Sequence, residues 1–289
     1  MANGILILDK PADWTSHDAV SKLRGVLHER RIGHGGTLDP MATGVLPVFV
    51  GRATRAVELF ESAQKTYIAG LRLGMVTDTE DITGRTLAEH PVAVTEQALR
   101  TALEAQVGDQ LQTPPMYSAI KIGGKKLYEL ARAGKSVERK PRPITIYEMT
   151  LLGFDGVHAE FRVTCSKGTY VRSICRDLGE RLGCGGCLDS LRRTAAGVYT
   201  ERDAVTVEQI LAAAEPLSFL RPVDSLFADL PAVTVGEKET WRIRNGGAVL
   251  WEAPVGRCRV YAPDGTFLML GEEQPDGMLL TVKSFFEVS

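Results

Sequence analysis

Short apolar segments bounded by glycine or proline recur along most of the chain, but they do not alternate with helices at a regular spacing. Parallel sheets require that alternation, because each parallel strand needs a long crossover connection. The pattern instead predicts an α+β fold, with a mainly antiparallel mixed sheet flanked by helices. The strands are predicted at residues 4–8, 45–50, 66–73, 144–154 and 159–165.

The first helix signal follows the first strand. Thr15 and Asp18 have the spacing of a capping box, with Asp in place of the usual Glu, and apolar residues follow on one stripe. These features predict a helix that runs to about Arg30. Further helices are predicted at residues 95–107, 125–133, 169–182 and 207–214.

The segment between Pro216 and Pro231 has the character of a domain boundary. Beyond it, two Asp-Gly dipeptides, at Asp264 and Asp276, are turn signals that join short antiparallel strands. A chain of 289 residues is long enough for one large domain and a small one. We therefore expect a larger domain over residues 1–225 and a small all-β barrel over residues 230–289.

Composition argues against several classes of protein. Apolar residues make up 44% of the chain and charged residues 24%, as in ordinary soluble proteins, and no apolar run is long enough to span a membrane. The five cysteines are an odd number with uneven spacing, which argues against a disulfide framework and for a cytoplasmic protein. Cys184 and Cys187 form a lone pair with no second pair nearby, so no metal site is predicted.

Positive charge is concentrated in one segment. Residues 121–142 contain eight basic and two acidic residues, a net charge of +6, whereas the whole chain has a net charge of −2. Such asymmetry is typical of a protein in which one face binds a polyanion. A solvated basic helix with no ligand gives the same count, and charge alone does not separate these two interpretations.

The loop from Gly33 to Gly44 has four glycines in twelve residues. Glycine allows backbone conformations that other residues avoid, and it lets a bulky ligand approach closely. Within this loop, Pro40 restricts Asp39 to an extended conformation, which projects the carboxylate away from the chain. Asp39 is therefore a candidate catalytic acid, although an Asp before Pro is also a common turn former.

The same loop resembles the catalytic motif of the pseudouridine synthases, in the branch called TruB, the tRNA pseudouridine-55 synthases. Further segments resemble the family in consistent order, and together they cover about residues 3–220. One departure is Asp13, which stands where the family commonly has glycine. The matching segments are Asp9-Lys10-Pro11 with Thr15-Ser16-His17-Asp18, Lys65-Thr66-Tyr67, Thr113–Gly134, and Gly168–Ser173 with Leu191–Thr194.

The resemblance implies three catalytic residues. Asp39 matches the essential aspartate, and Arg172 matches an arginine that keeps this carboxylate ionised. Tyr67 matches a tyrosine that stacks on the target base and is a candidate acceptor of its carbon-5 proton. From the residues alone, Arg172 could also make an exposed ion pair, and Tyr67 could be a core aromatic. The substrate-binding residues implied by the resemblance are His34, Leu191, Lys10, Gly36, Tyr170, Lys121, Lys125, Lys126 and Arg132.

The function implied by the resemblance is isomerisation of the T-loop uridine of tRNA, at position 55, to pseudouridine without a cofactor. The uridine is flipped out of the RNA, its glycosidic bond is broken, and the uracil is rejoined to the ribose through carbon 5. Residues 113–142 would form an inserted element that closes over the T-loop arm. Residues 230–289 resemble a PUA domain, which contacts the acceptor end of tRNA.

Two alternative functions remain open from the sequence. One is a synthase of the same fold that acts on another RNA, and the other is an RNA chaperone that binds and remodels the tRNA elbow. Nothing in the sequence requires an obligate protein partner or a membrane, and a monomer is expected.

If the basic segment binds RNA, removing charge at Lys125, Lys126 and Arg132 weakens tRNA binding and lowers its dependence on salt. Each lost phosphate contact lowers the slope of log K against log salt concentration by about one. We expect the variant with glutamine at all three positions to show both changes in binding titrations at several salt concentrations. An unchanged slope would mean that these side chains do not contact the phosphates.

Overall fold

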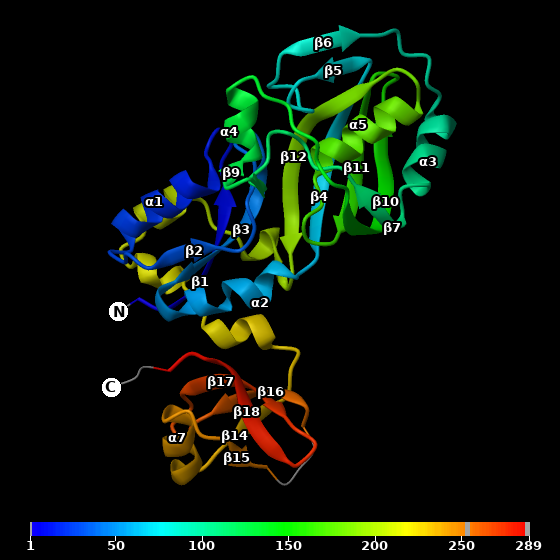
Figure 1. Ribbon diagram of the computed structural model, residues 1–289. Helices are drawn as coiled ribbons and strands as arrows, with labels where there is room; N and C mark the ends of the chain where they lie inside the picture. The colour runs from blue at the N-terminus through cyan, green and yellow to red at the C-terminus, as the bar shows by residue number, and fades with distance from the viewer. Residues whose placement is uncertain (1, 252–254, 287–289) are drawn as a thin grey trace.

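The computed structural model describes residues 2–251 and 255–286, which form a large mixed sheet with flanking helices and a smaller sheet near the C-terminus (Figure 1). The strands of the large sheet lie in the order β1 (Gly4–Lys10), β3 (Thr43–Val50), β12 (Gly186–Ala196), β4 (Lys65–Leu73), β11 (His158–Cys165), β10 (Arg142–Phe154) and β7 (Gly108–Gln112). Among the described residues, every pair in this order is antiparallel except β3 with β12. The predicted α+β class with a mainly antiparallel sheet is confirmed.

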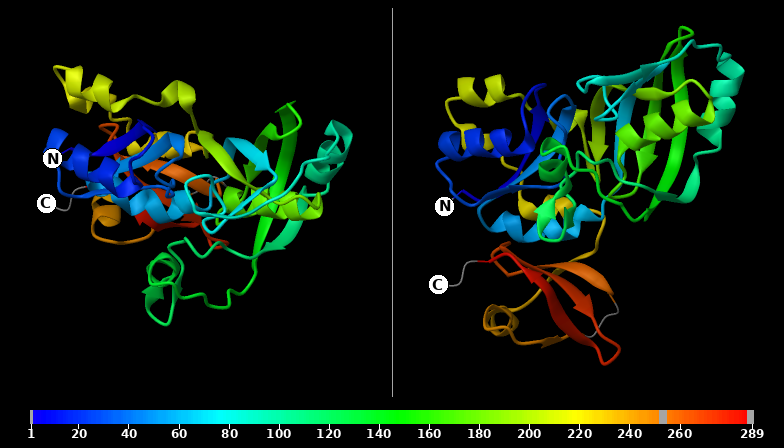
Figure 2. Two further views of the ribbon diagram at one scale, coloured as in Figure 1. Left: turned by 90° about the horizontal axis from the view of Figure 1, so that it is seen from above. Right: turned by 45° about the horizontal axis from the view of Figure 1, so that its top comes forward.

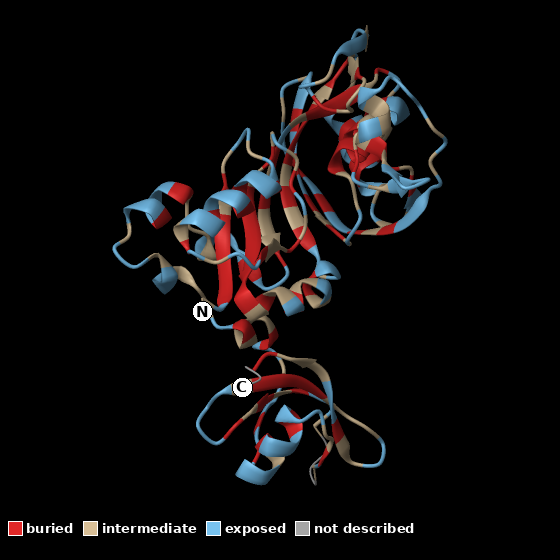
Figure 3. Ribbon diagram, turned by 60° about the vertical axis from the view of Figure 1, so that its left-hand side comes forward, coloured by how far each residue is buried: buried red, intermediate tan, exposed pale blue. Residues whose placement is uncertain are grey.

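Strands β1 and β3 are apolar at consecutive positions because both faces of this part of the sheet are covered (Figure 3). On one face, Leu6 packs with the apolar stripe of α1 (Ser16–Val26). On the other face, Ile7 packs with Phe60 of α2 (Val57–Glu61). The two-sided burial makes this end of the sheet a firm support for the loop that joins α1 to β3.

Helix α1 ends earlier than the sequence predicts. Its capping box of Thr15 and Asp18 is present, but the helix ends at Val26, and His28 takes the left-handed conformation with φ of 50°. A left-handed residue cannot continue a right-handed helix, so the predicted end near Arg30 is wrong. No helix in residues 2–251 and 255–286 is long and apolar enough to cross a membrane. Four other helices lie within their predicted ranges: α3 (Glu96–Glu104), α4 (Leu127–Arg132), α5 (Val171–Arg181) and α6 (Val207–Ala212).

Several short strands were not predicted. The residues Gly123 and Gly124, both with positive φ, form a tight turn between two of them, and this hairpin replaces the start of the helix predicted from residue 125. Strands of two to four residues carry too little periodicity to be detected in a sequence. The short strands of this domain are β2 (Ile32–His34), β5 (Met75–Thr77), β6 (Thr86–Glu89), β8 (Lys121–Ile122), β9 (Lys125–Lys126) and β13 (Tyr199–Thr200).

The smaller sheet has its own apolar cluster, and the predicted turns at Gly265 and Gly277 join its longer strands. This module also contains α7 (Glu237–Arg244), so it is not purely β. Only Thr240 and Ile243 of α7 are buried, which explains why the sequence shows no apolar stripe there. The strands lie in the order β14 (Ala232–Thr234), β16 (Arg257–Tyr261), β17 (Phe267–Glu273), β18 (Met278–Ser284) and β15 (Val249–Leu250).

The module contacts the larger part of the chain beside α2, away from the outer strands β10 and β7 (Figures 1 and 2). Arg55 donates hydrogen bonds to the carbonyl and the hydroxyl of Ser284, and Lys283 pairs with Glu58. Phe285 joins the apolar cluster that also contains Phe60. The module is thus attached through both polar and apolar contacts.

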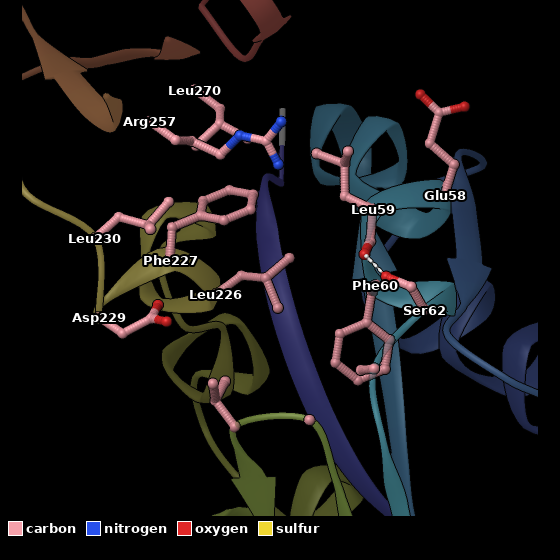
Figure 4. Close-up of a pocket in the computed structure, with 13 residues that line it drawn as sticks. Glu58, Leu59, Phe60, Ser62, Leu226, Phe227, Asp229, Leu230, Arg257 and Leu270 are labelled. Atoms are coloured by element: carbon pink, nitrogen blue, oxygen red, sulfur yellow. Dashed lines mark hydrogen bonds between the residues drawn. The ribbon is translucent and has the colours of Figure 1, made fainter. Parts of the chain in front are cut away.

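A cavity of about 410 Å³ lies at this junction (Figure 4). Leu59 and Phe60 line one side, and Phe227, Arg257 and Leu270 line the other. None of the residues that line the cavity belongs to the loop at 33–44. The cavity is therefore a feature of the junction and is separate from the Asp39 loop.

The turn after β1 contains a residue under backbone strain. Asp13 has φ of 65°, and its N–H donates to the carbonyl oxygen of Pro40 at 2.9 Å. The left-handed conformation costs a residue with a side chain ~1–2 kcal/mol, and glycine at this position would remove that cost. Part of this stabilisation is offset, because glycine also has more conformational freedom in the unfolded chain. We expect Asp13→Gly to raise the free energy of unfolding by about 0.5 kcal/mol in urea denaturation.

Lys22 is an exposed residue inside α1 and provides the control. Glycine there gains nothing from a positive φ, so we expect Lys22→Gly to lower the free energy of unfolding by about 1 kcal/mol. If Asp13→Gly lowered it as well, the strain assigned to Asp13 would be refuted.

Candidate active site

The Asp39 loop enters the sheet next to β12 and β4. Gly44, at the end of the loop, pairs with Arg193 of β12, and Arg193 pairs in turn with Tyr67 of β4. Gly44 has φ of 100°, and a Cβ there would lie 2.3 Å from the carbonyl oxygen of Arg193, so only glycine fits. Because directly paired residues share a face, Tyr67 and Arg193 lie on the same face of the sheet.

Arg172, the second residue of α5, binds the Asp39 carboxylate through two hydrogen bonds. Its Nε lies 2.8 Å from Oδ2, and its Nη2 lies 3.1 Å from Oδ1. The side chain of Arg172 is only 4% exposed, whereas that of Asp39 is 34% exposed. The structure therefore brings the two residues together in a bidentate pair, and the alternative of an exposed ion pair does not apply to Arg172.

Two more N–H groups of the Arg172 guanidinium have backbone partners. Nη1 donates to the carbonyl oxygen of Thr79 at 3.1 Å, and Nη2 donates to that of Tyr117 at 2.9 Å. A second carboxylate, Asp81, has its Oδ2 3.8 Å from Nε. Asp81 was not predicted, because in the sequence it is one acidic residue in a turn and nothing marks it as a neighbour of Asp39.

The backbone on either side of Asp39 is held to the start of α1. Ser16 Oγ accepts from the N–H of Leu38 at 2.9 Å and donates to its carbonyl oxygen at 3.2 Å. Lys10 Nζ donates to three carbonyl oxygens, including that of Pro40 at 3.2 Å. Sequence reasoning assigned no role to Ser16. The two side chains restrain the residues before and after Asp39.

Lys10 is fully buried, and burial lowers its pKa to about 8. Its three ammonium protons are taken up by carbonyl oxygens, as the hydrogen bonds above show. The sequence analysis assigned Lys10 to substrate binding. In the structure its ammonium group is withdrawn from the surface and holds the loop.

Arg193 supports the other side of the loop and was also missed. It is 1% exposed; its Nε donates to the carbonyl oxygen of Val45 at 2.7 Å, and its Nη2 donates to that of Gly36 at 3.1 Å. Gly36 has φ of 97°, which allows its carbonyl group to face the guanidinium. The structure thus gives Gly36 a contact with Arg193, and no contact with a ligand is needed to explain its presence.

Tyr67 and Leu191 lie on the same face of the sheet as Arg193, and each is 8% exposed. Burial raises the pKa of the Tyr67 hydroxyl above its ordinary value, although the positive charge of Arg193 opposes the shift. Tyr67 therefore stays protonated at neutral pH. The structure places both residues beside the Asp39 loop, where an aromatic ring and an aliphatic side chain offer an apolar surface.

Comparison with known families identifies the relationship. Residues 24–171 match the TruB family pseudouridylate synthase N-terminal domain, and residues 172–228 match the tRNA pseudouridylate synthase B C-terminal domain. This chain belongs to the TruB family. Neither match includes residues 230–289, so the smaller module lies outside both.

Individual members of the family are similar over nearly the whole chain. The tRNA pseudouridine synthase B of Azoarcus sp. (strain BH72) is 45% identical over 277 residues, covering 95% of this chain and 92% of that protein. The protein of the same name from Ralstonia pickettii (strain 12J) is 47% identical over 284 residues, covering 93% of this chain and 89% of that protein. The relationship therefore extends across the Asp39 loop and α5.

A solved structure shares the fold. A chain in the crystal structure of a Cbf5-Nop10-Gar1 complex superposes with a TM-score of 0.74, covering 99% of this chain and 86% of that chain. The two sequences are 24% identical, so this similarity concerns the architecture alone.

Two further residues singled out by the TruB resemblance, His34 and Tyr170, differ in their surroundings. His34 ends β2, and among the described residues its buried Nδ1 has no hydrogen-bond partner. Tyr170 is the N-cap of α5, and its N–H donates to Oε1 of Gln112 at 2.8 Å, while Gln112 Nε2 donates to its carbonyl oxygen at 3.0 Å. Burial raises the pKa of Tyr170. Gln112, which was not predicted, thus fixes the start of the helix that carries Arg172.

The basic segment projects from the body of the protein around α4, as the left view of Figure 2 shows. Lys121, Lys125 and Arg132 are exposed, and Lys126 is half-buried. The Nζ of Lys126 and the guanidinium carbon of Arg132 each lie 5.3 Å from the centre of the Tyr128 ring. The Tyr128 ring is thus engaged with two cations of its own segment.

The described residues include no group of three His, Cys, Asp or Glu side chains placed to hold a metal ion. Cys184 and Cys187 are both buried free thiols. Burial raises the pKa of Cys187 to about 11. The thiol of Cys187 therefore stays protonated and unreactive at neutral pH.

His34 makes stability depend on pH in a defined direction. Burial lowers its pKa below 6.5, so between 6.5 and that lower value the unfolded chain binds more protons than the folded protein. Stability therefore falls as pH falls through this range. We expect the free energy of unfolding, measured in urea at about pH 7.5 and about pH 5.5, to differ less between the two pH values in His34→Gln than in the wild type.

His90 is an exposed histidine and serves as the control. We expect His90→Gln to keep the wild-type difference between the two pH values. A His34→Gln variant with that same difference would show that His34 does not contribute.

Proposed function

We propose that this chain isomerises the T-loop uridine of tRNA to pseudouridine, with Asp39 as the essential group. The observation that carries the proposal is the bidentate pair that Arg172 forms with Asp39 within a restrained loop, in a chain that belongs to the TruB family. The relatives named tRNA pseudouridine synthase B support tRNA as the substrate. Residues 1–225 would carry the chemistry.

Asp39 needs to be oriented to act on the sugar, and the two N–H groups of Arg172 hold its carboxylate in one orientation. The carboxylate either attacks C1′ or removes a ribose proton, and in both routes the bond between N1 and C1′ breaks. The uracil turns, and C5 bonds to C1′. In the first route this bond replaces the bond between the carboxylate and C1′, and in the second route the ribose regains the proton that it lost. C5 then loses its proton and N1 gains one, so that the product is an isomer of the substrate.

The target base would lie against Tyr67 and Leu191. A uridine stacked in folded RNA cannot bring its C1′ to the Asp39 carboxylate, so it must be flipped out at a cost of a few kcal/mol. Stacking on an aromatic ring and contact with an aliphatic side chain offset part of that cost. The raised pKa of Tyr67 disfavours its phenolate, and we assign it stacking ahead of proton transfer.

The RNA backbone would be bound by the exposed cations of the basic segment, Lys121, Lys125 and Arg132, together with Lys126. His34, near the start of the loop, would occupy the space left by the flipped nucleotide. The module at residues 230–289 would contact the acceptor end, as in a PUA domain. Lys10, Ser16 and Arg193 would position the loop without touching RNA.

Asp39→Asn tests the proposed chemistry. Asparagine keeps the size of the side chain but removes the negative charge, so we expect pseudouridine formation to fall by at least about 10³-fold, as for other essential groups. The dissociation constant for tRNA should change by less than about twofold, because Asp39 contributes little to the RNA contact area. Product is measured by nucleoside mapping of an unmodified tRNA transcript, and affinity by filter binding.

Asp155→Asn, in the exposed turn between β10 and β11, is the matched control and should behave as the wild type. A transcript with cytidine in place of the T-loop uridine should give no product. Turnover by Asp39→Asn would exclude the assigned role. Pseudouridine at another position, or binding and remodelling without product, would favour another RNA substrate or a chaperone.

A further inference from the structure

The loop that joins β5 to β6 supplies two contacts to Arg172 and carries backbone strain between them. Glu80 has φ of 64°, although it is not a glycine. The residue before it, Thr79, accepts a hydrogen bond from Arg172, and the residue after it, Asp81, lies 3.8 Å from the same guanidinium. A left-handed residue with a side chain costs ~1–2 kcal/mol, so another interaction must compensate.

The side chain of Glu80 provides that interaction. Its Oε2 accepts a hydrogen bond from Ser173 Oγ at 2.7 Å, and its Oε1 pairs with Nη1 of Arg176. Ser173 and Arg176 both belong to α5, and Ser173 directly follows Arg172. The side chain of Glu80 is 12% exposed, so its charge is shielded from water and paired. The carboxylate therefore ties the strained loop to the helix that carries Arg172.

The other side of the loop is attached to the sheet. The N–H of Leu188 in β12 donates to the carbonyl oxygen of Glu80 at 3.0 Å, and the N–H of Ile82 donates to that of Leu188 at 2.8 Å. Arg176 is itself oriented by Asp177, whose Oδ1 lies 2.6 Å from Nη2. Glu80 thus connects two rigid elements, α5 and β12, at the point where the loop contacts Arg172.

We propose that Glu80 is a positioning residue for the reaction, which holds Thr79 and Asp81 around Arg172 and so keeps the Asp39 carboxylate oriented. This inference rests on the proposed function. Glu80 would act through the loop between β5 and β6, because the described hydrogen bonds and ion pairs include none between Glu80 and Asp39. Loss of this tie frees the loop to shift, and a displacement of about 1 Å around a catalytic group lowers the rate of the chemical step by up to about 10²-fold.

Two replacements of Glu80 separate the tie from the strain. Glu80→Gln keeps the strain and removes the charge, whereas Glu80→Gly removes both the strain and the side chain. Glu180→Gln is the matched control, because Glu180 lies 4.0 Å from the same Arg176 on the exposed surface of α5 and does not reach the loop. The measurements are the single-turnover rate on tRNA, the tRNA dissociation constant, the melting temperature and amide hydrogen exchange over residues 77–84.

We expect both Glu80 variants to lose about tenfold in single-turnover rate, with the dissociation constant changed by less than about twofold. Amide exchange over residues 77–84 should be faster in both. Glu80→Gly should melt no lower than Glu80→Gln, because it gains from relief of strain. Glu180→Gln should match the wild type in all four measurements.

A wild-type rate with wild-type exchange in Glu80→Gln would overturn the proposal. So would a rate loss that follows the melting temperature across the variants, since that is the behaviour of a purely structural residue. If the wild type forms no pseudouridine, the proposed function fails on its own account. The amide exchange data then still test whether the Glu80 carboxylate holds the loop to α5. Faster exchange in Glu80→Gln supports this attachment, and unchanged exchange refutes it.

Discussion

The buried guanidinium of Arg172 is the centre on which the site depends. A charge withdrawn from water is tolerated only where it is paired and its donors are satisfied. Here Asp39 supplies two acceptors, and the carbonyl groups of Thr79 and Tyr117 supply two more. A buried donor without a partner costs about 1–3 kcal/mol, so the three segments that carry these acceptors cannot move independently of α5. The position of Asp39 is therefore coupled to the fold as a whole.

Two further buried cations support the same loop by a different means. Lys10 and Arg193 bind carbonyl oxygens of the loop and its flanks, and the described hydrogen bonds and ion pairs include no carboxylate for either. Backbone carbonyl groups are fixed in place by the strands and turns that hold them, so these contacts restrain the main chain directly. The close approach of the chain to β12 at position 44 requires glycine. Because the main chain is restrained, the loop can be rich in glycine and still present Asp39 in one orientation.

Structural features that depend on residues close together in the sequence were predicted correctly. The strands with long apolar runs, the capped start of α1 and the turns at Gly265 and Gly277 follow from residues that are close in sequence. The conspicuous residues of the site, Asp39, Arg172 and Tyr67, were found through the family motifs that contain them. Ser16, Asp81 and Glu80 were not found, because each acts through a partner at least about 20 residues away. Short strands and α7 escaped detection for lack of periodicity.

The chemistry available to this protein follows from its residue types: an acid before proline in a glycine-rich loop, an arginine, a tyrosine and a basic segment. Folding adds their arrangement. A lysine is usually exposed at the surface, but the pairing of β1 with β3 places Lys10 in the interior, next to the end of the loop. Glu80 looks like one more acidic residue until α5 brings Ser173 and Arg176 to it. A side chain's role depends on its partners and on its access to water, and both are set by long-range packing that no local segment encodes.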